Sequence, residues 1–238
     1  MSNIVGTGMI RNREDGKNYI YKMQVLEPKN TDEILNLQHE ILSALKNKEV
    51  CVYLSEIEVK EMIAGSGEML GVFVNETLVA FGAILFPRER EDNLGRDLGF
   101  KDEELMKVAH LEFAVVHPVY RDNSLQKKVA EYLVRKIIDD GSWNCIMNTI
   151  SPYNPISLQT DFFLGLFIKK LSRKYDNVLR YILIYDINNP IKLETDTIIS
   201  VPALDIIRQE ELLKIGYYGV GFEDGTENER ILFGKVVN

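Results

Sequence analysis

The residues best suited to chemistry lie in a short polar segment, 117–124, between two regular elements. The preceding stretch, 108–116, is mostly apolar and predicts a strand. The following stretch, 125–138, predicts a helix whose apolar face carries Leu125, Val129, Leu133 and Ile137. A strand, a polar turn and a helix N-terminus bring unpaired backbone N–H groups and the positive end of the helix dipole together. The pattern therefore indicates an anion-binding turn, although the spacing alone is a weak signal.

Composition excludes several classes of protein. The chain has 238 residues, enough for one sizeable core, with 36 acidic and 28 basic side chains and a formal net charge of -8. This balance argues against binding nucleic acid and leaves a cationic substrate open. No spacing of His, Cys and carboxylates resembles a metal site. The N-terminus has no secretory pattern, and no apolar run approaches the ~18 residues of a membrane span. Cys51 and Cys145 lie among apolar residues and suggest buried thiols, with a disulfide left open. We therefore expect a cytoplasmic protein with no membrane partner.

The elements before the turn follow from periodicity and capping. Residues 1–17 predict a loose or edge segment, and 19–26 alternate as a half-buried strand does. A helix starts at Thr31, and a second, short helix starts with the capping-box pair Ser55 and Glu58. Two strands, 69–74 and 78–86, flank a polar turn and predict a hairpin. The charged stretch 87–106 predicts a solvated loop or, alternatively, a lid over a polar substrate.

The turn also carries a family resemblance. Leu111-x-x-Ala114-x-Val116-x-Pro118-x-Tyr120-Arg121-Asp122-Asn123-Ser124-Leu125-Gln126 resembles the acyl-CoA-binding segment of the GNAT N-acetyltransferase superfamily, V-x-P-x-Y-R-G-x-G-hydrophobic-G. The resemblance implies that the backbone of Arg121, Asp122, Asn123, Ser124, Leu125 and Gln126 wraps the pyrophosphate of coenzyme A. Ser124 and Gln126 depart from the pattern at positions that are often small or glycine, where the backbone approaches a phosphate closely.

The resemblance continues downstream and covers residues 19–188. Ser151-Pro152-Tyr153-Asn154-Pro155-Ile156-Ser157 is similar to the family's P-x-N-x-x-(A/S) entry into its fourth helix, after a strand at 143–150. It implies that Asn154 hydrogen-bonds the cofactor arm, with Ser157 nearby. Gly165-Leu166-Phe167 resembles the step into the sixth strand, and 179–187 would be the seventh.

The fold class expected from this resemblance is mixed α/β: the GNAT fold, a twisted, mostly antiparallel mixed sheet with flanking helices. We expect a loose N-terminal segment at 1–18, an acetyltransferase core at 19–190 and a C-terminal extension at 191–238 packed on the core. In the extension, 202–215 predicts a helix, and 217–222 and 231–237 predict a strand pair. The helix residues expected to face inward are Leu204, Ile207, Leu212 and Ile215.

The resemblance implies an N-acetyltransferase that moves an acetyl group from acetyl-CoA to a primary amine of a small molecule by direct attack, without a metal. Backbone groups of Val115 and Val116 would donate to the thioester. Glu112 is the expected base, and an equally weighted alternative is that it only binds positive charge.

The remaining candidates leave alternatives open. His110 would relay a proton to Glu112 or be structural. His39 is expected to be a surface or packing residue of the first helix, and His117 is expected to be structural. The family often has a tyrosine in its fourth helix, but 160–163 contains none. Either Tyr153, a water or bulk solvent would protonate the thiolate, or catalysis would be mainly positioning. An acyl-CoA-binding regulatory protein and a protein or peptide acetyltransferase are the alternatives, and a homodimer is left open.

Overall fold

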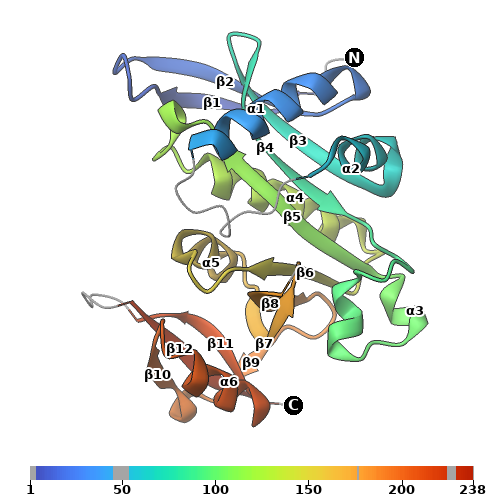
Figure 1. The fold of residues 1–238 in the computed structure, drawn as a ribbon, viewed down its shortest axis with the longest axis vertical. Coiled ribbons are helices and arrows are strands. Elements are labelled where there is room, and N and C mark those ends of the chain that lie inside the picture. The colour runs from blue at the N-terminus through green and yellow to red at the C-terminus, as the bar shows by residue number, and fades with distance from the viewer. Residues whose placement is uncertain (1–3, 45–53, 176, 224–228, 238) are drawn as a thin grey trace. The chain divides into compact units, whose positions relative to one another are not determined.

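The computed structural model describes residues 4–44, 54–175, 177–223 and 229–237. Its contacts divide the chain into two compact units, which are described separately (Figure 1). Unit one comprises residues 1–86 and 111–139, and unit two comprises residues 87–110 and 140–238. This division differs from the three parts expected from the sequence, and the boundaries of a core and an extension stay a prediction.

Unit one contains an antiparallel meander. Strands β1 (Ile4–Arg11), β2 (Asn18–Val25), β3 (Gly67–Val74) and β4 (Thr77–Leu85) pair in that order, and β5 (Val108–Val116) follows β4. The expected strands and hairpin are confirmed. Of the two structures left open for the first residues, 4–11 form an edge strand. The β3–β4 turn places Asn75 and Glu76 at φ 47° and 63°, in the left-handed region that tight hairpin turns require.

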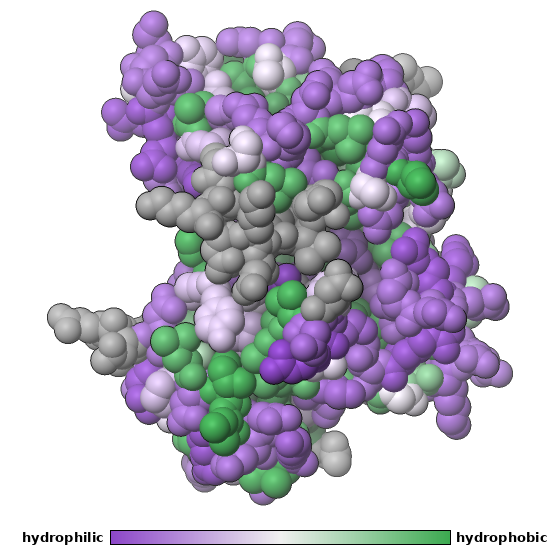
Figure 2. Space-filling model, viewed as in Figure 1, coloured by the Kyte–Doolittle hydropathy of each residue, from purple (hydrophilic) through white to green (hydrophobic). Residues whose placement is uncertain are grey.

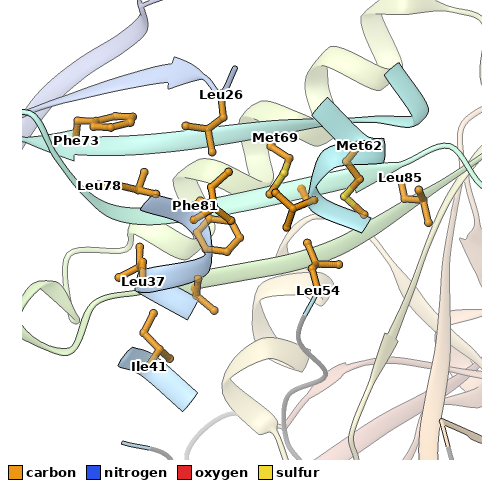
Figure 3. Packing of buried hydrophobic residues seen from close by; sticks show 14 residues of the cluster. Leu26, Leu37, Ile41, Leu54, Met62, Met69, Phe73, Leu78, Phe81 and Leu85 are labelled. Carbon is orange, nitrogen blue, oxygen red and sulfur yellow. The ribbon is translucent and has the colours of Figure 1, made fainter. Parts of the chain in front are cut away.

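One face of this sheet packs against α1 (Thr31–Ala44) and α2 (Glu56–Glu61). The capping box that begins α2 is confirmed: Glu58 N–H donates to Ser55 Oγ at 3.3 Å, and Ser55 N–H donates to Glu58 Oε2 at 2.7 Å. Figure 3 shows the core between the helices and the strands. Its labelled members are Leu26, Leu37, Ile41, Leu54, Met62, Met69, Phe73, Leu78, Phe81 and Leu85.

The other face of the sheet carries α4 (Leu125–Asp140). Lys136 of α4 pairs with Glu68, which lies beside Met69 on β3 and therefore points to the face opposite the core of Figure 3. The expected apolar stripe is buried: Leu125, Val129, Leu133 and Ile137 all face inward. The helix after the polar segment thus packs firmly from its first residue.

Unit two holds the remaining strands. The first three residues of β5 pair in parallel with β6 (Cys145–Ile150), which pairs antiparallel with β8 (Val178–Asp186). β6 begins two residues later than the strand expected at 143–150. The antiparallel order continues through β7 (Phe167–Lys174), β11 (Tyr217–Phe222), β12 (Arg230–Val237) and β10 (Ile199–Pro202), with β9 (Lys192–Leu193) beside β12. The expected strands of the core and of the C-terminal pair are confirmed, and their turn at 224–228 lies outside the described residues.

The charged stretch 87–106 is built into unit two. It forms a 3-10 turn at Leu94–Leu98 and a short helix, α3 (Asp102–Leu105). Asn93 is fully buried, and its Nδ2 donates to Arg88 O at 2.6 Å and Leu105 O at 3.1 Å. Lys174 of β7 pairs with Asp97 at 2.6 Å, with both side chains mostly buried. The expectation of a wholly solvated loop is therefore wrong, because Asn93 organises the segment from inside.

The C-terminal helix differs from expectation in its start and its inner face. α6 spans Ile206–Lys214, because Pro202 ends β10 and Asp205 caps the helix through Arg208 N–H at 3.1 Å. Leu212 is buried as expected, but Leu204, Ile207 and Ile215 are exposed. Figure 2 shows that hydrophobic residues also reach the surface of unit two on the face that it draws. These three positions correct the predicted orientation.

A polar side chain takes the buried place instead. Gln209 of α6 is fully buried, accepts a hydrogen bond from Tyr181 OH on β8, and donates to Pro202 O and Ala203 O at 2.9 Å each. These hydrogen bonds satisfy backbone and hydroxyl groups that would be costly to leave unpaired in the interior. The C-terminal helix is thereby tied to β8.

Candidate functional site

The polar segment after β5 forms a tight turn with an unusual backbone. A 3-10 turn at Pro118–Tyr120 follows β5, and α4 begins at Leu125. Asp122 and Ser124 have φ 64° and 56°, a left-handed conformation that favours glycine. Both positions align with glycines of the family pattern given above, whose third glycine aligns with Gln126. The turn therefore keeps the conformation that glycine provides, although the side chains differ.

Ser124 closes the turn onto the helix. Its carbonyl accepts the Lys128 N–H at 3.0 Å, the first helical hydrogen bond of α4. The N–H groups of a helix's first turn have no carbonyl partner within the helix. Leu125 and Gln126 belong to this turn of α4, with Leu125 buried and Gln126 partly buried. The anion-binding role expected of this turn stays a prediction.

Asn123 ties the turn to the N-terminal strand. Arg11 N–H donates to Asn123 Oδ1 at 2.8 Å, and Asn123 Nδ2 donates to Arg11 O at 2.8 Å. The same Nδ2 donates to Tyr120 O at 3.0 Å and Arg121 O at 3.3 Å. The amide therefore pairs with the edge strand as another strand residue would. Sequence reasoning missed this contact, which joins residues 112 positions apart.

Several cations surround the turn. Arg13 Nη1 lies 3.1 Å from Asp122 Oδ2, and Arg13 N–H donates to Val119 O at 2.8 Å. Lys128 Nζ donates to Asn123 O at 3.2 Å and lies 5.5 Å from the centre of the Tyr21 ring. Arg121 is exposed. The acidic chain thus has a locally basic surface at this turn.

Unit one also holds the expected residues of β5. Glu112 is partly buried, and Val115 is buried in the core shown in Figure 3. His117 N–H donates to Val79 O at 2.8 Å, toward β4. Because successive N–H groups of a strand alternate, that of Val115 points toward β4 as well, and that of Val116 points to the opposite edge. The geometry favours Val116 over Val115 as a donor to a ligand.

Two of the three histidines, His110 and His117, make structural contacts. His110, in unit two, is buried, and its Nε2 accepts the Leu94 N–H at 3.1 Å. This contact supports the structural alternative for His110. His117 Nε2 lies 2.9 Å from Glu40 Oε1, and its Nδ1 accepts the Val119 N–H at 3.3 Å. His39 is exposed.

In unit two, the expected cofactor and acid residues lie at the start of α5 (Pro155–Phe163). Asn154 is its N-cap, and its Oδ1 accepts the Ser157 N–H at 3.2 Å. The interaction fixes both residues at the helix N-terminus, where an N-cap is worth ~1 kcal/mol. Tyr153 is about half exposed, and its N–H donates to Ser151 Oγ at 3.3 Å.

A buried acid accompanies this helix, and sequence reasoning gave it no role. Asp161 of α5 is 3% exposed and accepts a hydrogen bond from Asn148 Nδ2 of β6 at 2.8 Å. Burial raises the pKa of Asp161 to about 7, because the charged carboxylate loses its hydration. Asp161 lies within 160–163, the stretch where the resemblance leads one to look for a tyrosine. The sequence did carry a signal for this buried acid, because Asp161 follows the apolar Leu158 by three residues and so shares its face of the helix.

Other reactive features are limited among the residues that the structure describes. Cys145 is a buried thiol whose pKa burial raises to about 12, and Cys51 lies outside the described residues. Within the described ranges, no group of three or more His, Cys, Asp and Glu side chains could hold a metal ion. None of the described helices is long and apolar enough to span a membrane.

Comparison with known proteins relates the architecture to solved structures. No protein-family model and no curated protein matches the sequence. An acetyltransferase of the GNAT family from Streptococcus pneumoniae superposes with a TM-score of 0.54 and 15% identity over 69% of this chain and 97% of that chain. NAA60 from Arabidopsis thaliana, solved with acetyl-CoA, superposes with a TM-score of 0.55 and 12% identity, covering 71% of this chain and 99% of that chain. The ribosomal-protein-S5-alanine acetyltransferase from Vibrio fischeri superposes with a TM-score of 0.52 and 9% identity, covering 71% of this chain and 94% of that chain. At these identities the likeness establishes a shared fold.

Proposed function

We propose that this chain, which has the GNAT acetyltransferase fold, transfers an acetyl group from acetyl-CoA to a primary amine of a small molecule. The observation that carries the proposal is the turn before α4. Asp122 and Ser124 keep a left-handed backbone without being glycine. A conformation that costs ~1–2 kcal/mol for such residues occurs in tight turns and is also common at ligand-binding sites, where the backbone approaches a ligand closely.

The residues present fit the phosphates of coenzyme A. The segment from Arg121 to Gln126 would cradle the pyrophosphate with backbone N–H groups at the positive end of α4. Arg121 and Lys128 add positive charge to this turn. Asn154 and Ser157 would bind the cofactor arm from the start of α5.

The chemistry divides among a few groups of this chain. Acetyl-CoA, when bound, supplies the acetyl thioester. Glu112 would take a proton from the acceptor's ammonium group, so that the neutral amine can form the new N–C bond as the C–S bond breaks. Val116 N–H would donate to the carbonyl oxygen as negative charge develops there. Tyr153 would return a proton to the departing sulfur. Its exposed position makes solvent an equivalent proton source.

A second candidate is an acyl-CoA-binding regulatory protein with little catalysis. One observation favours it: residues 160–163 include no tyrosine, and the acid there, Asp161, is buried. A thiolate leaves readily without an acid, so we expect the missing tyrosine to slow transfer without abolishing it. Protein or peptide acetylation is the other alternative, since relatives in fold such as the Vibrio fischeri enzyme are named for a protein substrate.

The test measures cofactor binding and thiol release separately. Calorimetry with coenzyme A should show binding by the wild-type protein, and acetyl-CoA with a panel of small amines should release free thiol. Glu112→Gln should lower kcat by ~100-fold while leaving the affinity for coenzyme A unchanged, because a general base contributes ~10²–10⁴-fold. Glu131→Gln is the matched control, since Glu131 pairs with Arg135 on the surface of α4.

Each outcome separates the candidates. Tight binding of coenzyme A without thiol release from any amine or peptide would establish the regulatory candidate instead. Thiol release with peptides but with no small amine would refute a small-molecule acceptor and support protein or peptide acetylation. Failure to bind coenzyme A would refute the cofactor assignment.

A further inference from the structure

The edge strand β1 and the residues after it bring an arginine to the turn before α4. The Asn123 side chain holds Arg11 through two hydrogen bonds of 2.8 Å. Two residues further on, Arg13 N–H donates to Val119 O at 2.8 Å. The backbone on both sides of residue 12 is therefore anchored to the segment 119–123. Such anchoring places Arg13 beside the turn before any ligand arrives, so less ordering entropy is lost on binding.

The guanidinium of Arg13 lies beside the exposed Asp122 side chain of the turn. Its Nη1 is 3.1 Å from Asp122 Oδ2, and the two side chains are 55% and 77% exposed. Asp122 occupies a position where glycine would carry no charge, so its carboxylate would repel a ligand rich in phosphate. Arg13 offsets this charge. An exposed ion pair is worth little by itself, so the guanidinium can be shared with a ligand at small cost.

We propose that Arg13 is a phosphate-binding residue of the coenzyme A site, supplied by the N-terminal hairpin. This inference rests on the proposed function and extends it to a residue outside the resembling segment. A guanidinium offers paired donors that match phosphate oxygens. It would remain beside Asp122 while one of its edges turns to the phosphates, as the exposure of both side chains allows. Lys128, held by Asn123 O, provides a second cation at the same turn.

The experiment is calorimetric titration of coenzyme A into wild type, Arg13→Ala, Asp122→Asn and the double variant. Arg13→Ala should weaken coenzyme A binding by ~5–10-fold, and Asp122→Asn should strengthen it by ~2-fold. In the Asp122→Asn protein, Arg13→Ala should still weaken binding at least ~3-fold, because the direct contact with phosphate is lost there too. Arg135→Ala is the control, since that exposed arginine pairs with Glu131 on α4. It should leave the dissociation constant unchanged.

The outcomes distinguish this inference from the proposed function. If wild type binds coenzyme A and Arg13→Ala binds it equally well, Arg13 is not a ligand and only this inference fails. If Arg13→Ala weakens binding in wild type but has no effect in Asp122→Asn, Arg13 merely neutralises Asp122, and the direct contact is refuted. If wild type does not bind coenzyme A, both fail. Thermal denaturation of each variant confirms that it is folded, as expected for substitutions at exposed side chains.

Discussion

Replacing Ser124 with glycine should stabilise the protein. Ser124 has φ 56°, and its carbonyl, not its hydroxyl, makes the hydrogen bond to Lys128 N–H. A left-handed residue with a Cβ costs ~1–2 kcal/mol. Glycine removes this cost, but it also makes the unfolded chain more flexible, which takes back ~0.4–1 kcal/mol of the gain. The net gain expected for the free energy of unfolding is ~0.5–1 kcal/mol.

The assay is urea denaturation of wild type, Ser124→Gly and Ser124→Ala, with the slope of each transition compared. Ser124→Gly should raise the midpoint at unchanged slope and raise Tm by ~1–4 °C. Ser124→Ala is the matched control, since it removes the hydroxyl but keeps the Cβ. It should bring no gain. Equal stabilisation by alanine and glycine, or a loss of stability with glycine, would refute the assignment of strain to this backbone position.

Two further predictions concern unit two. Asp161→Asn should flatten the dependence of stability on pH. Burial raises the folded-state pKa of Asp161 to about 7, above its value in the unfolded chain. The free energy of unfolding of the wild type should therefore be highest below about pH 4 and should decrease as the pH rises through 7, by on the order of 4 kcal/mol at pH 8. Urea midpoints measured from pH 4 to 8 check this, and parallel profiles for wild type and variant would count against a titrating Asp161. Gln209→Leu should lower the free energy of unfolding by ~3 kcal/mol, because it leaves Tyr181 OH and two carbonyls without their partner. Tyr181→Phe removes one of these bonds and should cost ~1–2 kcal/mol, so an equal loss in both variants by thermal denaturation would be inconsistent with the network.

The elements and the turn were predictable because their signals are short-range. The apolar stripe of α4 repeats along one helix, and the Ser55–Glu58 pair spans three residues. The polar turn lies between two such elements. Asp122 and Ser124 are left-handed and occupy two of the three positions where the resembling pattern has glycine, so the motif located this backbone conformation although neither residue is glycine.

The orientation of α6 was not predictable from the same kind of pattern. Periodicity places Ile207 inward on hydrophobicity alone, yet it is 75% exposed, and Gln209 is fully buried. The reason lies on β8, where Tyr181 donates to Gln209. A polar side chain is favoured inside a protein only where distant groups satisfy it.

For this protein, the sequence by itself determined most of the strands and helices, the capping box that begins α2 and the position of the polar turn before α4, because each depends on residues close together in the chain. The tertiary structure decided which side chains meet at that turn and which polar groups are buried. Asn123 pairs with Arg11 across 112 residues. Asp161 loses its hydration on burial and accepts a hydrogen bond from Asn148, which lies on another element. Burial and long-range pairing depend on which segments pack together, and no local pattern carries that information.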